Sequence, residues 1–380
     1  MAESDTRLTI LVTTYNRYPF LLRLLRYYRA TGAVFPLMVL DSSSEAMPHE
    51  VEGCCQGPRV TRITYETTIL PTQKLYDGVR RVRTPYVVLW DDDDLMVPRT
   101  FEVGVSLLDV RPDVRVVHGA TGHFQMDVAG ETRAIVGILR EPQKDFPEET
   151  ASARLLHYLR SWTAMFHSLH RTQDLQEIFA QCRAMGFGFI PPGDVSHRIH
   201  RSDLWVELTV ACLSVIQGKV QRLPDLFMLR ERHAGVDSWE ESSRNCDLFD
   251  WMTSPSFHSA YETFCACLSQ ALARQDGLSL GEARAVVKQG FWSGLGRALT
   301  NKWSVRYGPQ GDDAIARWRQ AARRLPGLRT AWRQVRSCLP GHELSLEALL
   351  RPASRYHADF MPMYRAIMGE PIDGNGRHGR

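Results

Sequence analysis

The sequence predicts an α/β protein with a mostly parallel sheet, followed by a helical C-terminal region. Over roughly the first 230 residues, short apolar runs alternate with segments whose apolar residues recur at helical spacing, a pattern typical of parallel α/β sheets. Polar residues gather directly after several of these runs, where such sheets bind ligands. From Val236 onward, tryptophans and long helical patterns replace the alternation. We therefore expect an α/β domain at residues 1–235 and a helical region at residues 236–380.

The first four predicted strands are short runs of apolar and β-branched residues, which suit strands buried on both faces. Two segments between these runs, Phe20–Tyr28 and Lys74–Val82, have apolar residues at helical spacing. The four runs are Leu8–Thr13, Leu37–Leu40, Val60–Tyr65 and Tyr86–Trp90.

The later part of the α/β region is less regular. Residues 122–180 indicate a mixture of hairpin and helix, and residues 186–194 have the composition of a loop. Leu204–Gln217 is a strongly apolar helix that ends at Gly218, a residue common just past a helix end. Val114–Gly119 and Leu226–Leu229 are predicted strands on either side of these segments.

Composition and charge exclude several classes of protein. The net charge of +3 is too small to indicate a nucleic-acid partner. None of the eight cysteines forms a C-x-x-C pair, which argues against a zinc ribbon or a thioredoxin-like redox site. We find no cationic, apolar leader and no apolar run long enough to span a bilayer. We therefore expect a cytoplasmic protein with free thiols.

Four consecutive aspartates follow the fourth predicted strand. Adjacent carboxylates repel one another, and a cation relieves that repulsion. In an extended segment Asp91 and Asp93 lie on one side and Asp92 on the other. Two such carboxylates together with a diphosphate can complete the oxygen shell of Mg²⁺ or Mn²⁺. The simpler alternative is a solvated acidic loop, but the flanking segments YVVLW and LMVP are apolar.

Several segments together resemble family-2-like GT-A glycosyltransferases over roughly residues 8–235. They are LTILVTTYNRYPFLLRLL, PTQKLYDGV, TPYVVLWDDDDLMVP, SDLWVEL and GKVQRLPDLFMLRERH. The resemblance implies a GT-A Rossmann-like sheet and a nucleotide-sugar donor, with a UDP-sugar favoured. It also implies Mg²⁺ or Mn²⁺ and inversion at the sugar carbon, with a glycan, lipid-linked or small-molecule hydroxyl as acceptor. Two departures are the missing Glu-Asp pair before the apolar helix and the three serines after Asp41.

We predict that the donor's nucleotide lies beside the turns after the first two strands. Tyr15 can stack on the base, and Arg17 can approach the phosphates. Asp41 can accept from a base N–H, or it can be a turn aspartate. Lys74 resembles a family residue near the donor, although a solvated helix charge has the same pattern. The predicted donor-binding residues are Thr13, Tyr15, Arg17, Asp41, Lys74, Asp91 and Asp92.

The resemblance makes Asp91 and Asp93 the D-x-D metal pair, with Asp93 as the main ligand and Asp91 as a second or indirect one. Asp94 can instead cap the following turn. His233, in an R-x-H arrangement after a strand, resembles the closing metal ligand of many GT-A enzymes, although a surface histidine is the plain alternative.

An inverting transfer needs a general base on the acceptor hydroxyl. Asp203, at the head of the apolar helix, is the first candidate, and a helix cap is its alternative role. Glu207 is one turn later on the same face and is the second candidate. Asp194 is the third.

Other clusters have simpler interpretations. The pairs His167 with His170 and His197 with His200 have i, i+3 spacing without a nearby third ligand, so we expect structural or surface roles. Arginines and tryptophans are interleaved over residues 317–336 without an acidic residue. Such a segment can contact anionic lipid headgroups at the inner face of a membrane or bind an acidic acceptor. It can also be a helix that packs its tryptophans on the catalytic domain.

Two other functional classes fit part of the pattern. A sugar-phosphate nucleotidyltransferase has a similar sheet and a metal, but it needs a glycine-rich loop where this chain has TTYNRYP. A non-catalytic nucleotide-sugar-binding module does not need carboxylates at both the metal and base positions. Neither a P-loop motif nor a Rossmann G-x-G-x-x-G motif is present.

Overall fold

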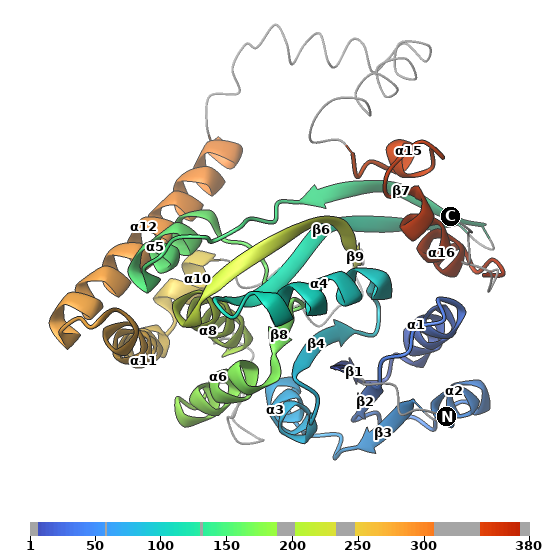
Figure 1. The fold of residues 1–380 in the computed structure, drawn as a ribbon, viewed down its shortest axis with the longest axis horizontal. Helices are drawn as coiled ribbons and strands as arrows, with labels where there is room; N and C mark the ends of the chain where they lie inside the picture. The colour runs from blue at the N-terminus through green and yellow to red at the C-terminus, as the bar shows by residue number, and fades with distance from the viewer. Residues whose placement is uncertain are drawn as a thin grey trace, which may run out of the picture.

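The computed structural model describes residues 7–57, 59–129, 132–187, 202–232, 248–307 and 343–372. Its centre is a nine-stranded mixed sheet in the order β3-β2-β1-β4-β8-β6-β9-β5, with β7 paired to β6 (Figure 1). Helices cover both faces of the sheet, and further helices follow in the C-terminal part. The predicted α/β class with a helical C-terminal part is confirmed.

The first half of the sheet is parallel, as predicted. Its strands are apolar along nearly their whole length, except for β3 at the edge. The pairing aligns Thr13 with Asp91 and Thr14 with Asp41, so the polar strand ends meet at one edge. The elements of this half are β1 (Leu8–Thr14), α1 (Tyr18–Ala30), β2 (Leu37–Asp41), α2 (His49–Cys55), β3 (Val60–Thr64), α3 (Pro71–Arg81) and β4 (Tyr86–Asp91).

The second half of the sheet contains antiparallel pairs. The short β8 (Leu169–Arg171) lies antiparallel to β4 and to β6, and therefore joins the two halves. The predicted strands Val114–Gly119 and Leu226–Leu229 are parts of longer strands. The elements are β5 (Leu95–Met96), α4 (Pro98–Val110), β6 (Val114–Ala129), β7 (Thr132–Glu141), α5 (Ala151–Ser161), α6 (Thr172–Ala184), α8 (Ser202–Gln217) and β9 (Lys219–Arg232).

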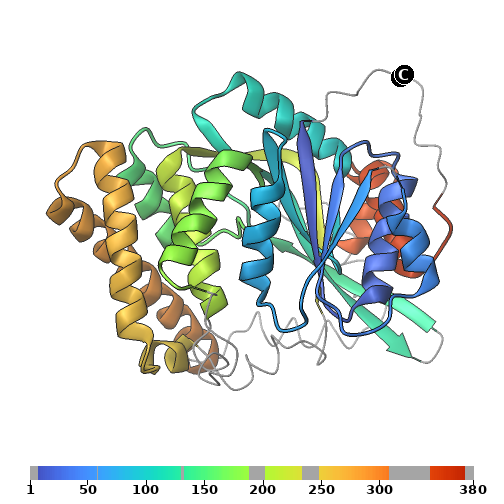
Figure 2. The ribbon, with the colours of Figure 1, turned by 90° about the horizontal axis from the view of Figure 1, so that it is seen from below.

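The C-terminal helices pack at two ends of the molecule (Figure 2). Helices α11 (Phe257–Asp276) and α12 (Leu280–Tyr307) contact α5, and α11 also contacts α8, whereas α16 (His357–Met368) contacts α1. The remaining short helices are α10 (Leu248–Thr253) and α15 (Leu346–Leu349).

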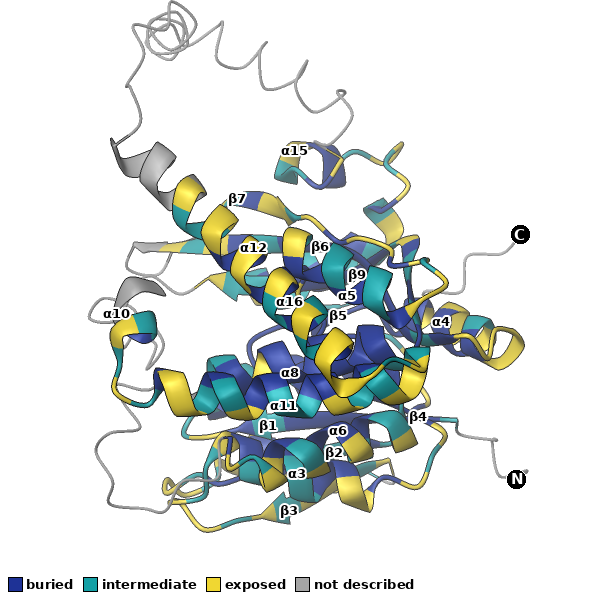
Figure 3. Cartoon of the chain, turned by 90° about the vertical axis from the view of Figure 1, so that its left-hand side faces the viewer, coloured by how far each residue is buried: buried dark blue, intermediate teal, exposed yellow. Residues whose placement is uncertain are grey.

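Helix α8 is mostly buried between the sheet and these helices, whereas α12 exposes one side to solvent (Figure 3). Trp205 of α8 stacks on Phe291 of α12 and lies against Trp251 of α10, which gives this layer an aromatic core. Gly294 of α12 lies so close to α5 that a Cβ there would be 2.2 Å from the Leu159 carbonyl oxygen. The helices therefore pack backbone against backbone at this point.

The predicted domain boundary at residue 235 and the segment 317–336 lie outside the described residues. Among the residues that are described, no helix has both the length and the apolar character needed to cross a bilayer.

Candidate active site

The four aspartates form a turn rather than an extended segment. Strand β4 ends at Asp91, and the backbone N–H of Asp94 donates to the carbonyl oxygen of Asp91 at 3.3 Å. Side chains alternate between two sides only where the chain is extended, so the alternation expected for Asp91, Asp92 and Asp93 does not apply to this turn. The turn instead brings Asp94 back toward Asp91.

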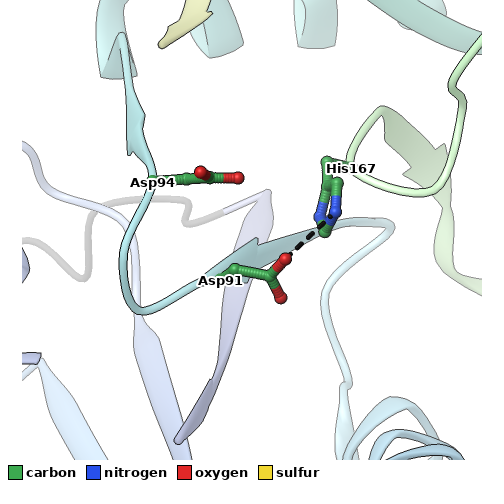
Figure 4. Close-up of side chains that lie close together, drawn as sticks. All are labelled: Asp91, Asp94 and His167. Carbon is green, nitrogen blue, oxygen red and sulfur yellow. Dashed lines mark ion pairs between the residues drawn. The ribbon is translucent and has the colours of Figure 1, made fainter. Parts of the chain in front are cut away.

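Asp91 and Asp94 form a cluster with His167, a residue that comes from the segment before β8 (Figure 4). One ligand atom from each of the three residues lies within 4.8 Å of the others. His167 Nε2 is 3.2 Å from Asp91 Oδ2, and His167 Nδ1 is 3.3 Å from the Leu89 carbonyl oxygen. Strand β8 makes this contact possible, because it pairs Leu169 with Val88 of β4.

The hydrogen bonds of His167 suit a metal ligand. A carbonyl oxygen only accepts, so Nδ1 carries the proton toward Leu89 and a neutral ring turns the lone pair of Nε2 toward Asp91. Burial lowers the pKa of His167 although Asp91 opposes the shift, and this favours the neutral ring. A cation between Nε2 of His167 and the carboxylate of Asp91 would relieve the repulsion between these two acceptors. Metal-binding histidines commonly donate their other N–H to a backbone carbonyl, as His167 does. The three side chains therefore fit Mn²⁺ or Mg²⁺, with the imidazole suiting Mn²⁺ better.

Arg230 of β9 lies beside the same cluster. Its Nε is 3.1 Å from Asp94 Oδ2, and its guanidinium also reaches Asp91 at 3.8 Å. The backbone N–H of Glu231 donates to the other oxygen of Asp94 at 3.1 Å. Burial raises the pKa of Asp94 well above its usual range, and Arg230 opposes that shift. Arg230 therefore supports the buried Asp94 carboxylate from strand β9.

The other two aspartates contact Arg17 in the turn after β1. Arg17 forms an ion pair with Asp93, and its Nε is 3.4 Å from Asp92. Asp92 also accepts from the Thr14 hydroxyl at 2.7 Å, and burial raises its pKa to about 7. Asp93 thus lies apart from the Asp91–Asp94–His167 cluster, and its role as the main metal ligand stays a prediction.

Asp41 is fully buried at the end of β2. It accepts from the backbone N–H of Ser43 at 2.9 Å, from Arg62 Nε at 2.9 Å and from the Tyr18 hydroxyl at 3.1 Å. Burial alone would raise its pKa, but the hydrogen bonds from Ser43 and Arg62 lower it. Contact between Asp41 and a donor's base stays a prediction, and Arg62 is a second polar group at this position.

The remaining predicted donor residues lie near the ends of β1 and β2. Tyr15 is 50 % exposed, and Thr13 is half-buried in register with Asp91. Lys74 is buried on α3, and its ammonium group donates to the Thr14 carbonyl oxygen at 2.8 Å and to Ser42 Oγ at 2.9 Å. Asn16 links the two turns with a positive φ of 53°, and the Ser44 N–H donates to its side chain at 2.9 Å.

We predict a pH dependence from Lys74. Burial lowers its pKa to about 8, although Asp41 and the aspartate run oppose the shift. If this cation attracts the donor's phosphates, UDP affinity should fall as pH rises through about 8, because the ammonium group is then lost. Titrations of UDP from pH 7 to 9.5 in wild type and in Lys74→Met measure this effect. The variant should bind more weakly at pH 7 and show a flatter profile.

The same group gives an opposite trend in stability. Between about pH 8 and the ordinary pKa of lysine, the side chain of Lys74 is protonated in the unfolded chain but deprotonated in the folded chain. The contribution of Lys74 to the free energy of unfolding therefore rises with pH in this range. A UDP affinity that does not change with pH in the wild type would contradict the role of Lys74.

The predicted acceptor-side residues are only partly described. Asp203 lies in the first turn of α8, but its side chain is outside the described residues. Glu207 is exposed one turn later, and its charge contributes to the raised pKa of Arg230. The other predicted residues His233, Asp194, His197 and His200 lie outside the described residues.

Residues 9–169 match the family model of glycosyl transferase family 2. We refer to these matched residues as the family-2 segment. The segment contains β1 to β4, the aspartate run and His167, so it includes the Asp91–Asp94–His167 cluster. The sequence-based resemblance, the GT-A fold class and the assignment to the glycosyltransferases are thereby confirmed.

Solved structures similar to this chain include those of S. aureus TarS. The TarS 1-349 structure is 14% identical, with a TM-score of 0.42, and the match covers 78% of this chain and 92% of TarS 1-349. TarS 1-349 in complex with UDP-GlcNAc is 14% identical with a TM-score of 0.44, over the same shares of both chains. TarS 1-349 in complex with UDP is 16% identical, with a TM-score of 0.41 and again 78% and 92% coverage. No curated protein matches the sequence significantly.

No sequence pattern predicts that Asp94 and His167 form a cluster with Asp91, or that Arg230 lies beside it. The sequence predicts a structural or surface role for His167, because the i, i+3 pair that it forms with His170 has no third ligand nearby in the sequence. Its partners are supplied by the pairing of β8 with β4, which no local pattern indicates. The position of Arg230 directly after the predicted strand Leu226–Leu229 was the one signal that could have indicated a residue of the site.

Proposed function

We propose that the chain is a metal-dependent, inverting glycosyltransferase that moves a sugar from a UDP-sugar to a hydroxyl group. The observation that carries the proposal is the cluster of Asp91, Asp94 and His167 at the carboxyl end of β4, within the family-2 segment. In mostly parallel sheets ligands bind beyond these strand ends. We propose a glycan, a lipid-linked molecule or a small molecule as the acceptor. For a lipid-linked acceptor, segment 317–336 is the proposed contact with the membrane.

The donor half of the reaction needs positive charge around a diphosphate. Asp91, Asp94 and His167 would hold Mg²⁺ or Mn²⁺, which would neutralise the charge that develops on the departing diphosphate. Lys74 and Arg17 supply further positive charge at the ends of β1 and β2. Tyr15, half exposed beside them, can stack on the base.

The acceptor half needs a base that removes the hydroxyl proton while the oxygen attacks the anomeric carbon. One displacement of this kind inverts the configuration and requires no covalent intermediate. Asp203 is our first proposal for the base and Glu207 our second. Both lie near the beginning of α8, where the helix dipole favours an ionised carboxylate.

A thermal-shift panel of nucleoside diphosphates, each with and without Mn²⁺, tests the donor half. UDP should raise the unfolding temperature only in the presence of Mn²⁺, and UDP-GlcNAc is the first nucleotide sugar to include. Slow release of UDP from a nucleotide sugar in water would distinguish an enzyme from a binding module. If no nucleoside diphosphate changes the unfolding temperature with Mn²⁺ present, the proposal is wrong.

A further inference from the structure

A second carboxylate–histidine pair lies next to the metal cluster. His123 of β6 has its Nε2 3.0 Å from Oε2 of Glu141, the last residue of β7. Both side chains are mostly buried, with 18 % and 16 % of their surfaces exposed. Neither residue follows a sequence pattern that predicts a role, and neither belongs to the Asp91–Asp94–His167 cluster.

The sheet register directs this pair toward Arg230. Glu141 is opposite Thr121, and His123 is opposite Arg230. Paired residues, and residues two apart along one strand, point to the same side of a sheet. His123, Glu141 and Arg230 therefore share one side, and Arg230 is the residue that contacts Asp94 and Asp91.

The charge of Glu141 reaches the same group of residues. Burial would raise the pKa of Glu141, but His123 and Arg230 hold it below its usual range, so the carboxylate is ionised. Arg230 is already engaged by Asp94 and Asp91, and His123 is engaged by Glu141. Of these three side chains, the carboxylate of Glu141 is therefore the one that can accept hydrogen bonds from a ligand.

The strand order indicates which part of a donor would reach Glu141. In the proposed function the nucleotide lies over the ends of β1 and β2, and the diphosphate lies at Asp91 of β4. The sheet continues from β4 through β8 to β6, which pairs with β7 and β9. The sugar follows the diphosphate on the side away from the nucleotide, and so it extends toward β6, β7 and β9.

We infer that Glu141, positioned by His123, binds hydroxyl groups of the donor sugar and restricts the donor to neutral hexoses or N-acetylhexosamines. A carboxylate accepts hydrogen bonds from sugar hydroxyls, and it repels the carboxylate of a uronic acid. This inference rests on the proposed function, because it places the sugar relative to a diphosphate at Asp91.

Calorimetric titrations of the full chain with Mn²⁺ test the inference. The ligands are UDP, UDP-GlcNAc, UDP-glucose and UDP-glucuronate. For wild type, at least one neutral UDP-sugar should bind at least about tenfold more tightly than UDP-glucuronate. Loss of a hydrogen bond to a charged group predicts that Glu141→Gln weakens binding of that neutral sugar by roughly 10- to 100-fold. UDP affinity should stay the same in this variant, which also shows that the site is folded.

Two further variants separate positioning from general destabilisation. His123→Ala should weaken binding of the neutral sugar, and His123→Gln should restore part of it because its amide can place an N–H group beside Glu141. Glu148→Gln is the matched control: Glu148 forms a similar pair with His157 at 2.6 Å, away from the residues of the site. This control should leave all affinities at wild-type values.

The outcomes distinguish this inference from the proposed function. An unchanged affinity of Glu141→Gln for every UDP-sugar would overturn the inference alone, as would equally tight binding of UDP-glucuronate and the neutral sugars by wild type. If wild type binds neither UDP nor any UDP-sugar with Mn²⁺, the proposed function fails, and the inference fails with it.

Discussion

Asp91→Ala is expected to abolish Mn²⁺-dependent UDP binding and, with it, transfer. Asp91 contacts both His167 and Arg230, and its side chain, at the carboxyl end of β4, is 37 % exposed. Loss of an outer-shell partner typically costs roughly 10- to 100-fold in metal affinity, and loss of a direct ligand should cost more. Titrations with UDP, with and without Mn²⁺, measure the effect. Asp91→Asn keeps the shape of the side chain and should lose nearly as much Mn²⁺-dependent UDP affinity, because asparagine lacks the negative charge.

Asp93→Ala is the matched comparison. It removes a neighbouring carboxylate of the same run, but one that forms an ion pair with Arg17 outside the cluster. We expect a smaller loss of Mn²⁺-dependent affinity than in Asp91→Ala. Equal losses of affinity in the two variants would support Asp93 as a metal ligand, the role predicted from the sequence. Undiminished Mn²⁺-dependent binding in Asp91→Ala would remove the proposed metal site altogether.

The parallel half of the sheet could be predicted because its signal is local. Parallel strands are covered on both faces, so each appears in the sequence as an unbroken apolar run that ends in polar residues. Strand β8 has only three residues and contains Leu169, His170 and Arg171. Its position depends on pairing with β4 and β6, which lie far away in the sequence. No periodic pattern over three residues can indicate such a strand.

The candidate site, like the sheet, could be predicted from the sequence only where its signal is local. The position of the aspartate run at the edge of the sheet follows from the strand before it, and so do the positions of Tyr15, Arg17 and Asp41. The residues that contact Asp91 could not be predicted in this way, because those contacts depend on a turn through Asp92 and Asp93 and on the pairing of strand β8 with β4. Glu141 and His123 join the site through the register of β6 with β7 and β9, and a shift of one residue would turn them to the other face.

Asp203→Asn is expected to lower transfer by about 10² to 10⁴, the usual range for loss of a general base, while UDP affinity with Mn²⁺ stays at the wild-type value. The base acts on the acceptor and not on the diphosphate, so the variant should lose turnover but keep its affinity for UDP. Asparagine keeps the size of the side chain and removes its charge, so helix α8 should form normally. Release of UDP from a nucleotide sugar measures turnover, and calorimetry measures binding.

Glu207→Gln is the control, because Glu207 lies one turn later on the same helix and carries the same charge. If Asp203 is the base, Glu207→Gln should retain most of the turnover. Wild-type turnover in Asp203→Asn together with an inactive Glu207→Gln would give the role to Glu207. If both variants turn over at the wild-type rate, the base does not lie on α8. Asp194 would then be the remaining carboxylate predicted from the sequence, and Asp194→Asn would be the decisive variant, since a direct displacement at the sugar still requires one group to take the hydroxyl proton.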